Sequence, residues 1–294
     1  MGGYNNGVRN EVDVFSVPTM ARTTLTLPTG VDLQAQMDNG GNWSRHVLAA
    51  GGKYGLQRSD TVQIFDIDRQ TWTTGKLSSG RHDFPSISSY WNGIGLTYFV
   101  GGMTADWGVP NNMPPVIDIF NHSQGLMSST RIQLTFGRSY SSAEVVGKYL
   151  LVIGGRNGDE SSSFATVDII DIESLSMFKT IYLQHSRAVH ASAVLGPYVY
   201  VGGGYRISVA GEERLASVEV IDTRSWTVFR VENLSYAGGA LAAASNDYGA
   251  FFGGGGGGTT DAIEFSTCGN KVLHEIISQI VIGRLRALLT SKIN

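Results

Sequence analysis

The feature that most constrains this chain is a pair of adjacent glycines that returns about every fifty residues. The pairs begin at positions 2, 51, 101, 154, 202 and 253, and glycine accounts for 38 of the 294 residues. A period of this length indicates a repeat architecture, in which each unit buries its apolar faces against neighbouring units. The repeat therefore predicts one continuous domain, although chain length alone suggests two.

Every repeat has the same order of segments. A short run of β-branched and aromatic residues precedes the glycine pair, as at Tyr149–Ile153, and such runs are typical of buried strands. After a variable polar loop comes a second strand that closes on Asp or Asn, a residue suited to a turn; these strands are 62–66, 117–121, 167–171 and 218–222. A third strand follows, and a fourth begins near an arginine.

Four strands of about six residues with their turns account for the period, so each repeat predicts a four-stranded antiparallel sheet. Arranged radially, such sheets cover one another's faces and protect their edges. The glycine pair, the strand at 62–66 (VQIFD) and a downstream tryptophan, Trp72 or Trp226, resemble the kelch repeat. The resemblance runs from residue 2 to about 265. It implies an all-β, six-bladed kelch-type β-propeller with a central channel and partners bound at one end.

The two ends of the chain leave the closure of the ring open. The first repeat has only its second half, so the first blade is expected to be incomplete at the N-terminus. We divide the chain into a propeller, 1–278, and a tail, 279–294. The tail could supply closing strands, or it could form an amphipathic C-terminal helix, since Leu273, Ile277 and Ile280 are near helical spacing. A third alternative is a fragment of a longer protein whose first blade is completed elsewhere.

Loops after the glycine pairs and loops before the arginine strands are expected at the same end of a propeller. Long loops on a rigid scaffold usually carry binding, and here they are 53–60, 103–115, 156–165 and 204–215. We predict that the last three form the partner face, because clustered guanidinium groups can bind carboxylates and an exposed tryptophan is a good anchor. The predicted partner-binding residues are Arg81, His82, Trp107, Arg138, Arg156, Arg187, Tyr205 and Arg206.

Both parts of this hypothesis have a structural alternative. Arg81, Arg138 and Arg187 recur at one register, and recurrence favours a role in which each arginine holds its own blade together by bonding loop carbonyls or an Asp. Trp107 could instead fold back over the neighbouring blade, since aromatic residues serve both purposes.

The sequence predicts no catalytic, cofactor or metal site. His185 and His190 lack the helical spacing of a zinc pair, and the six glycines at 253–258 precede a strand, so they do not form a phosphate-binding loop. The copper site of galactose-oxidase-like relatives and the iron motif of the specifier proteins of glucosinolate breakdown are both missing. A mutarotase-like activity on an acidic sugar is left open, because it requires only arginine and a carboxylate at the channel mouth.

Composition excludes several partners. A net charge of −3 without a basic run argues against nucleic acid. Apolar stretches in the tail are interrupted by charge, so no membrane span is expected. Cys268 is the only cysteine, which excludes an internal disulfide, and we expect a cytoplasmic protein.

Together these features predict a non-catalytic protein-interaction or scaffolding module that binds its partner on the loop face. One alternative is a carbohydrate-active propeller that binds or isomerises an acidic sugar at the channel mouth; an acidic peptide would suit the same arginines. Another is a structural subunit of a larger assembly. A basic, aromatic-lined pocket would favour the sugar, and a broad face would favour protein.

Overall fold

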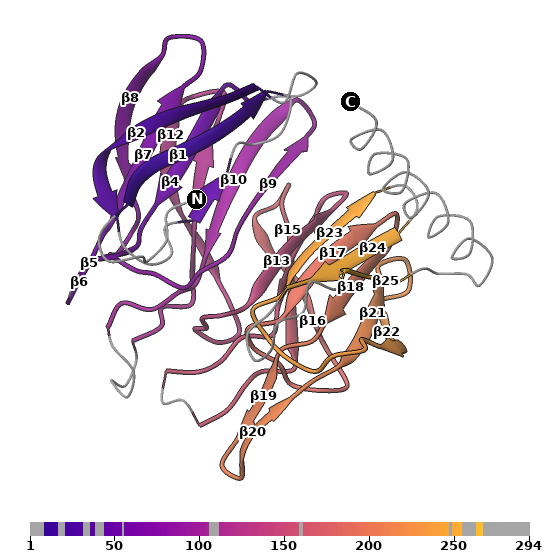
Figure 1. The fold of residues 1–294 in the computed structure, drawn as a ribbon. Coiled ribbons are helices and arrows are strands. Elements are labelled where there is room, and N and C mark those ends of the chain that lie inside the picture. Colours follow the sequence, from indigo (N-terminus) through magenta and orange to yellow (C-terminus); the bar gives the residue numbers. More distant parts are fainter. Residues whose placement is uncertain are drawn as a thin grey trace, which may run out of the picture.

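The computed structural model describes residues 9–16, 21–31, 36–38, 44–54, 56–105, 112–158, 161–246, 249–254 and 263–266. All regular structure in these ranges is β-strand (Figure 1). None of the described residues forms a helix of the length and apolarity that a bilayer crossing requires. The tail at 279–294 lies outside the described residues, so closing strand and helix both stay predictions for that segment.

Four of the sheets have four antiparallel strands each. Counted outward from the channel, the strand before a glycine pair is the second of its blade and the strand that closes on Asp or Asn is the third. The strand that begins after an arginine is the first strand of the next blade.

The first four-stranded sheet consists of β3 (Gln36–Asp38), β4 (His46–Ala50), β7 (Thr61–Asp66) and β8 (Thr71–Lys76). The second consists of β9 (Ser86–Trp91), β10 (Ile94–Val100), β11 (Val116–Asn121) and β12 (Leu126–Gln133). The third consists of β13 (Ser142–Val146), β14 (Tyr149–Ile153), β15 (Thr166–Asp171) and β16 (Ser176–Tyr182). The fourth consists of β17 (Ala191–Leu195), β18 (Tyr198–Gly202), β21 (Ser217–Asp222) and β22 (Thr227–Asn233).

The remaining strands form smaller sheets. The first described elements are an antiparallel pair, β1 (Arg9–Ser16) and β2 (Ala21–Val31). The last described elements form a three-stranded sheet, β23 (Ala242–Asn246), β24 (Gly249–Gly253) and β25 (Ile263–Ser266). Two hairpins extend the loops that follow glycine pairs: β5 (Lys53–Tyr54) with β6 (Gln57–Arg58), and β19 (Tyr205–Ser208) with β20 (Gly211–Arg214).

The large sheets are the blades of a propeller, because their first strands meet around a common centre. Strand β9 contacts β3 on one side and β13 on the other, β13 contacts β17, and β17 contacts β23. Figure 1 shows the blades fanning out from these inner strands. The all-β, kelch-type architecture predicted from the sequence is confirmed, and the total of six blades stays a prediction.

The core lies between the blades, which explains the continuous apolar runs. In β14, Leu150 and Val152 face the β9–β12 blade, whereas Leu151 and Ile153 face the β17–β22 blade. Successive side chains of a strand point to opposite faces, so a strand between two neighbours must be apolar at every position. The run at 149–153 meets this requirement.

The glycine pairs end the second strands, as predicted. Gly51 and Gly52 have φ values of 69° and 100°, in the region that favours glycine. Their position is one residue later in the β17–β22 blade: Gly202 closes β18, and the left-handed residues are Gly203 and Gly204. Three consecutive glycines allow either register, and the pairing of Gly202 with Val218 in the ladder decides it.

The acidic residues that close the third strands cap their turns, as the sequence indicated. Asp66, Asn121 and Asp171 each accept two backbone N–H bonds from residues two and three positions further on. Asp222 accepts the backbone N–H of Arg224 in the same way. Trp226 lies in this turn, directly before β22, rather than inside the strand.

Candidate functional site

The loops after the glycine pairs and the loops between blades meet at one end of the propeller, here called the loop end. Isolated β-bridges join them: His82 pairs with Met103, Ser139 with Arg156, and Ala188 with Tyr205. This confirms the expectation that both sets of loops emerge together. Trp107 and residues 159–160 lie outside the described residues, so the proposed anchoring role of Trp107 stays a prediction.

The three recurring arginines do not face a partner, which corrects the role expected from the sequence. Arg81, Arg138 and Arg187 have no exposed surface. Each guanidinium instead binds an acidic residue in the third strand of the blade it precedes. The Arg81–Asp118 distance is 2.6 Å, the Arg138–Asp168 distance 2.9 Å and the Arg187–Glu219 distance 2.5 Å.

Each arginine also satisfies backbone carbonyls where the chain leaves the second strand. Arg138 Nη1 donates to Gly154 O and Thr166 O, and Arg187 Nη1 donates to the equivalent carbonyls of Gly203 and Ser217. Burial lowers the pKa of these arginines, and the partner carboxylate opposes that shift. The structural alternative, in which each arginine holds its own blade together, accounts for these contacts.

The acidic partners were missed in the sequence, although a signal for them existed. The acidic partner is the third residue of β11, β15 and β21, namely Asp118, Asp168 and Glu219. In the β3–β8 blade the same position holds Gln63. In the three blades of β11, β15 and β21 an acidic residue at this position accompanies an arginine in the preceding loop, and that pairing would have indicated the ion pairs.

Backbone hydrogen bonds link four loops in an arc around the channel at the loop end. Asp83, Tyr140, Val189 and Ala240 are equivalent residues of four loops, and all have positive φ, between 51° and 58°. The N–H of Tyr140 donates to Asp83 O, that of Val189 to Tyr140 O, and that of Ala240 to Val189 O. Such left-handed conformations in non-glycine residues cost energy. Here each of these residues lies in the loop that leads into an inner strand.

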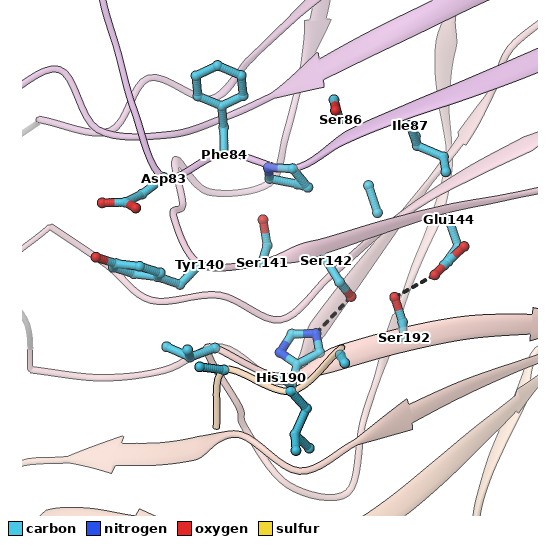
Figure 2. A pocket seen from close by; sticks show the side chains of 16 residues that line it. Asp83, Phe84, Ser86, Ile87, Tyr140, Ser141, Ser142, Glu144, His190 and Ser192 are labelled. Carbon is cyan, nitrogen blue, oxygen red and sulfur yellow. Dashed lines mark hydrogen bonds between the residues drawn. The ribbon is translucent and has the colours of Figure 1, made fainter. Parts of the chain in front are cut away.

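Inside this arc lies a pocket of about 500 Å³ (Figure 2). Its walls are the starts of β9, β13 and β17 with the loops that precede them. A second space of about 340 Å³ continues along the inner strands and shares Ile87, Glu144 and Ser192 with the first. The two together form the channel that the fold predicts.

Among the residues that line these two spaces, Glu144 is the one carboxylate on an inner strand. Its Oε1 accepts a hydrogen bond of 2.8 Å from Ser192 Oγ. Burial raises the pKa of Glu144 to about 7, against the smaller opposing effect of that hydrogen bond. At neutral pH the Glu144 side chain is therefore divided between carboxylic acid and carboxylate.

His190 is a second titratable group that lines the pocket. Its Nε2 is 2.9 Å from Ser142 Oγ, as Figure 2 shows. Burial, with the nearby charge of Arg187, lowers the pKa of His190 to about 3. The imidazole is neutral at physiological pH, so it adds no positive charge to the channel.

Sequence reasoning did not single out Glu144. When the repeats are aligned on the positive-φ residue, Glu144 falls in register with Ile87, Ala193 and Ala244. A lone carboxylate at a position where other repeats have apolar residues is the signal that was available. The sequence gives no sign that the first strands of the blades line a common channel, because these strands meet only in the folded protein.

The remaining predicted residues lie around the channel. His82 is buried, and its Nδ1 is 2.7 Å from Asp83 Oδ2, so it belongs to the framework rather than to a binding surface. Arg156 and Tyr205 are partly exposed at the bridges, and Arg206 is exposed beside Glu213. No three metal-binding side chains gather in the ranges that the structure describes.

Apolar side chains are exposed at the tips of the loop end. Val209, in the turn between β19 and β20, is 97% exposed, and Leu56, in the turn between β5 and β6, is 79% exposed. Phe136, in the loop between β12 and β13, is 47% exposed and stacks on Phe164. Figure 1 shows the β19–β20 hairpin extending well beyond the blade that carries it.

Comparisons with known proteins agree with this architecture. Residues 137–176 match the kelch motif. A solved structure entitled "Structure of YjhT" is similar with a TM-score of 0.66 at 12% sequence identity, over 90% of this chain and 96% of that one. At this identity the likeness shows the fold alone. No curated protein matches the chain in sequence.

Proposed function

This chain is a kelch-repeat β-propeller, and from that premise we propose that it is a non-catalytic module that binds a protein partner at its loop end. Kelch propellers commonly bind proteins through loops that a rigid ring of blades holds in place. The loops here converge at one end, and their tips carry exposed side chains on well-packed supports.

The observation that carries this proposal is the β19–β20 hairpin. All four residues of β20 are exposed, with charges of both signs, and Val209 at the tip is almost fully solvated. An exposed apolar residue on an ordered hairpin is costly to leave in water, and burying it against a partner recovers about 1.5–3 kcal/mol. The hairpin base is anchored, because Ile207 is buried and exchanges hydrogen bonds with Ser163.

The alternative of an acidic sugar at the channel mouth has less support. A binding site for an acidic sugar requires a basic pocket, and the three arginines expected there are buried within the blades. The 16 described residues that line the pocket include Asp83 and Glu144 but neither lysine nor arginine. An anion in this pocket would meet carboxylates instead of guanidinium groups.

A site-specific photocrosslinker tests the proposal. We place the photoreactive residue at Val209 and, as a control, at Leu126, an exposed apolar residue that begins β12 at the opposite end of a blade. After irradiation in native extract, a partner of the loop end should be captured from position 209 and not from position 126. The captured protein is then purified, and its affinity for the wild-type chain is compared with that for Val209→Asp and Leu126→Asp.

Loss of binding in Val209→Asp alone supports the loop end as the interaction surface. Equal effects of the two variants, or capture from position 126 alone, would reject it.

A further inference from the structure

The channel mouth combines carboxyl and hydroxyl groups without a balancing cation. Asp83 lies at one end of the pocket and Glu144 at the other, with Tyr140, Ser141 and Ser142 between them (Figure 2). The described lining contains neither lysine nor arginine, and His190 is neutral. Because the nearby charge of Arg187 is paired with Glu219, the carboxyl groups of the lining make the pocket more favourable for cations than for anions.

Several polar atoms that line the pocket have hydrogen-bonding capacity left over. Asp83 is only 8% exposed, and its Oδ1 has no hydrogen-bond partner among the described residues. The same holds for Ser141 Oγ and for Nδ1 of His190, which is also 8% exposed. Buried polar groups without partners cost about 1–3 kcal/mol each, so a ligand that supplies partners gains affinity from them.

We propose that the channel mouth binds a small polyhydroxylated amine, whose ammonium group pairs with Glu144 and whose hydroxyl groups bind the serines and Asp83. A six-carbon amino polyol fits within about 500 Å³. This site is independent of the protein-binding surface at the loop tips, because none of the exposed tip residues lines the pocket.

The electrostatics of Glu144 give the proposal a signature. The groups that face Glu144 from β9, β17 and β23 are uncharged, among them Ser88, Ser192 and Ser245. The other titratable groups of the mouth are Asp83, Tyr140 and His190. With the pKa of Glu144 raised to about 7 by burial, an ammonium group beside it stabilises the carboxylate and lowers that pKa. Binding at neutral pH must then release a proton from Glu144.

Three matched ligands separate the ligand classes. Glucamine, sorbitol and gluconate have the same six-carbon polyol chain and carry, respectively, an ammonium, a hydroxyl and a carboxylate at one end. Calorimetric titration of the full chain should show glucamine binding about tenfold more tightly than sorbitol. Gluconate should not bind measurably. Equal affinities for the three would overturn the proposal, and preference for gluconate would favour the acidic-sugar reading instead.

Proton release identifies the group responsible. Titrations near pH 7 in two buffers with different ionisation heats should report release of up to about half a proton per glucamine. The same titration near pH 9, where Glu144 is already ionised, should report none. Absence of release near pH 7 would show that the ammonium does not lie at Glu144.

The variant Glu144→Gln keeps the size of the side chain and an oxygen that can accept from Ser192. It should abolish the proton release and reduce glucamine affinity about tenfold, to the level of sorbitol. Glu212→Gln, an exposed carboxylate of the same end outside the pocket, is the matched control and should change neither. Unchanged glucamine binding in Glu144→Gln, with a thermal midpoint equal to that of the wild type, would overturn the proposal.

Discussion

At the residue scale, Arg138 and Asp168 show how this fold uses charge. Both side chains are fully buried, and Asp168 also accepts hydrogen bonds from the backbone and hydroxyl of Thr135 and from Thr180. Removing one partner of a buried pair leaves the other charge without compensation. We predict that Arg138→Met lowers the free energy of unfolding by about 3–5 kcal/mol, measured by urea denaturation.

The control for this variant is Arg206→Met, which removes the exposed partner of Glu213. It should change stability by less than about 0.5 kcal/mol. Adding Asp168→Leu to Arg138→Met should recover part of the loss, because no buried charge is then left unpaired. A cost for Arg138→Met no larger than that of Arg206→Met would mean that the pair does not hold the blade together.

The pH dependence of stability also belongs to single residues. His122 is buried between Ser44 and Thr97, and burial lowers its pKa to about 4 from an ordinary value near 6.5. Between these values the unfolded chain binds a proton that the folded chain does not. Stability from this residue is therefore complete above pH 6.5 and is lost as the pH falls toward 4.

We predict that His122→Asn reduces the loss of unfolding free energy between pH 7 and pH 4 by up to about 3 kcal/mol. Glu144 has the opposite sign, because its raised pKa makes the folded chain bind more protons between about pH 4.5 and 7. Glu144→Gln should therefore make the unfolding free energy rise more steeply with pH. His122→Asn should make it rise less steeply. Urea denaturation across this pH range measures both, and two variants with slopes changed in the same direction would contradict the assignment.

At the element scale, the glycine pairs can be tested for close approach separately from backbone conformation. Gly154 and Gly147 have the same φ of 57°. A Cβ at Gly154 would lie 2.5 Å from Arg187 O, whereas a Cβ at Gly147 would meet nothing within 4 Å. The left-handed conformation costs both alanine variants about 1–2 kcal/mol. We predict that Gly154→Ala costs a further 1–3 kcal/mol or so, because Cβ clashes with a backbone that cannot move aside.

Thermal unfolding of the two alanine variants measures this difference. An equal loss of stability in both variants would show that backbone conformation alone explains the regular spacing of the glycine pairs along the chain. A larger cost at Gly154 would show that the pair exists so that the loop between blades can pack directly against the end of the second strand.

At the scale of the whole molecule, burial divides each blade into a rigid inner part and a looser outer strand. Strands β10, β14 and β18 are largely buried, and so are β11, β15 and β21. The outer strands β8 and β16 are mostly exposed. We predict that amide hydrogen exchange is slowest in the second and third strands of every blade and faster in the outer strands, since local opening follows burial. Uniform exchange across a blade would contradict this division.

The repeat, the blade and its turns could be predicted from the amino-acid sequence, because these features depend on local patterns. Strand runs end at Gly101 and Gly154, and the turn caps at Asp66 and Asp171 are found where the sequence placed them. All of these features are made by residues close together in the chain. Period and local chemistry were therefore sufficient to predict them.

Which way the arginines face, and which residues line the channel, depend on contacts between segments that are far apart in the chain. Arg138 and Asp168 are thirty positions apart, and Glu144 and Ser192 belong to different blades. Their contacts arise when the sheets assemble around a common axis, so that burial and the available partners, rather than residue type, fix their roles. An arginine in a recurring register can equally face solvent or core, and the carboxylate in the third strand is what draws it inward.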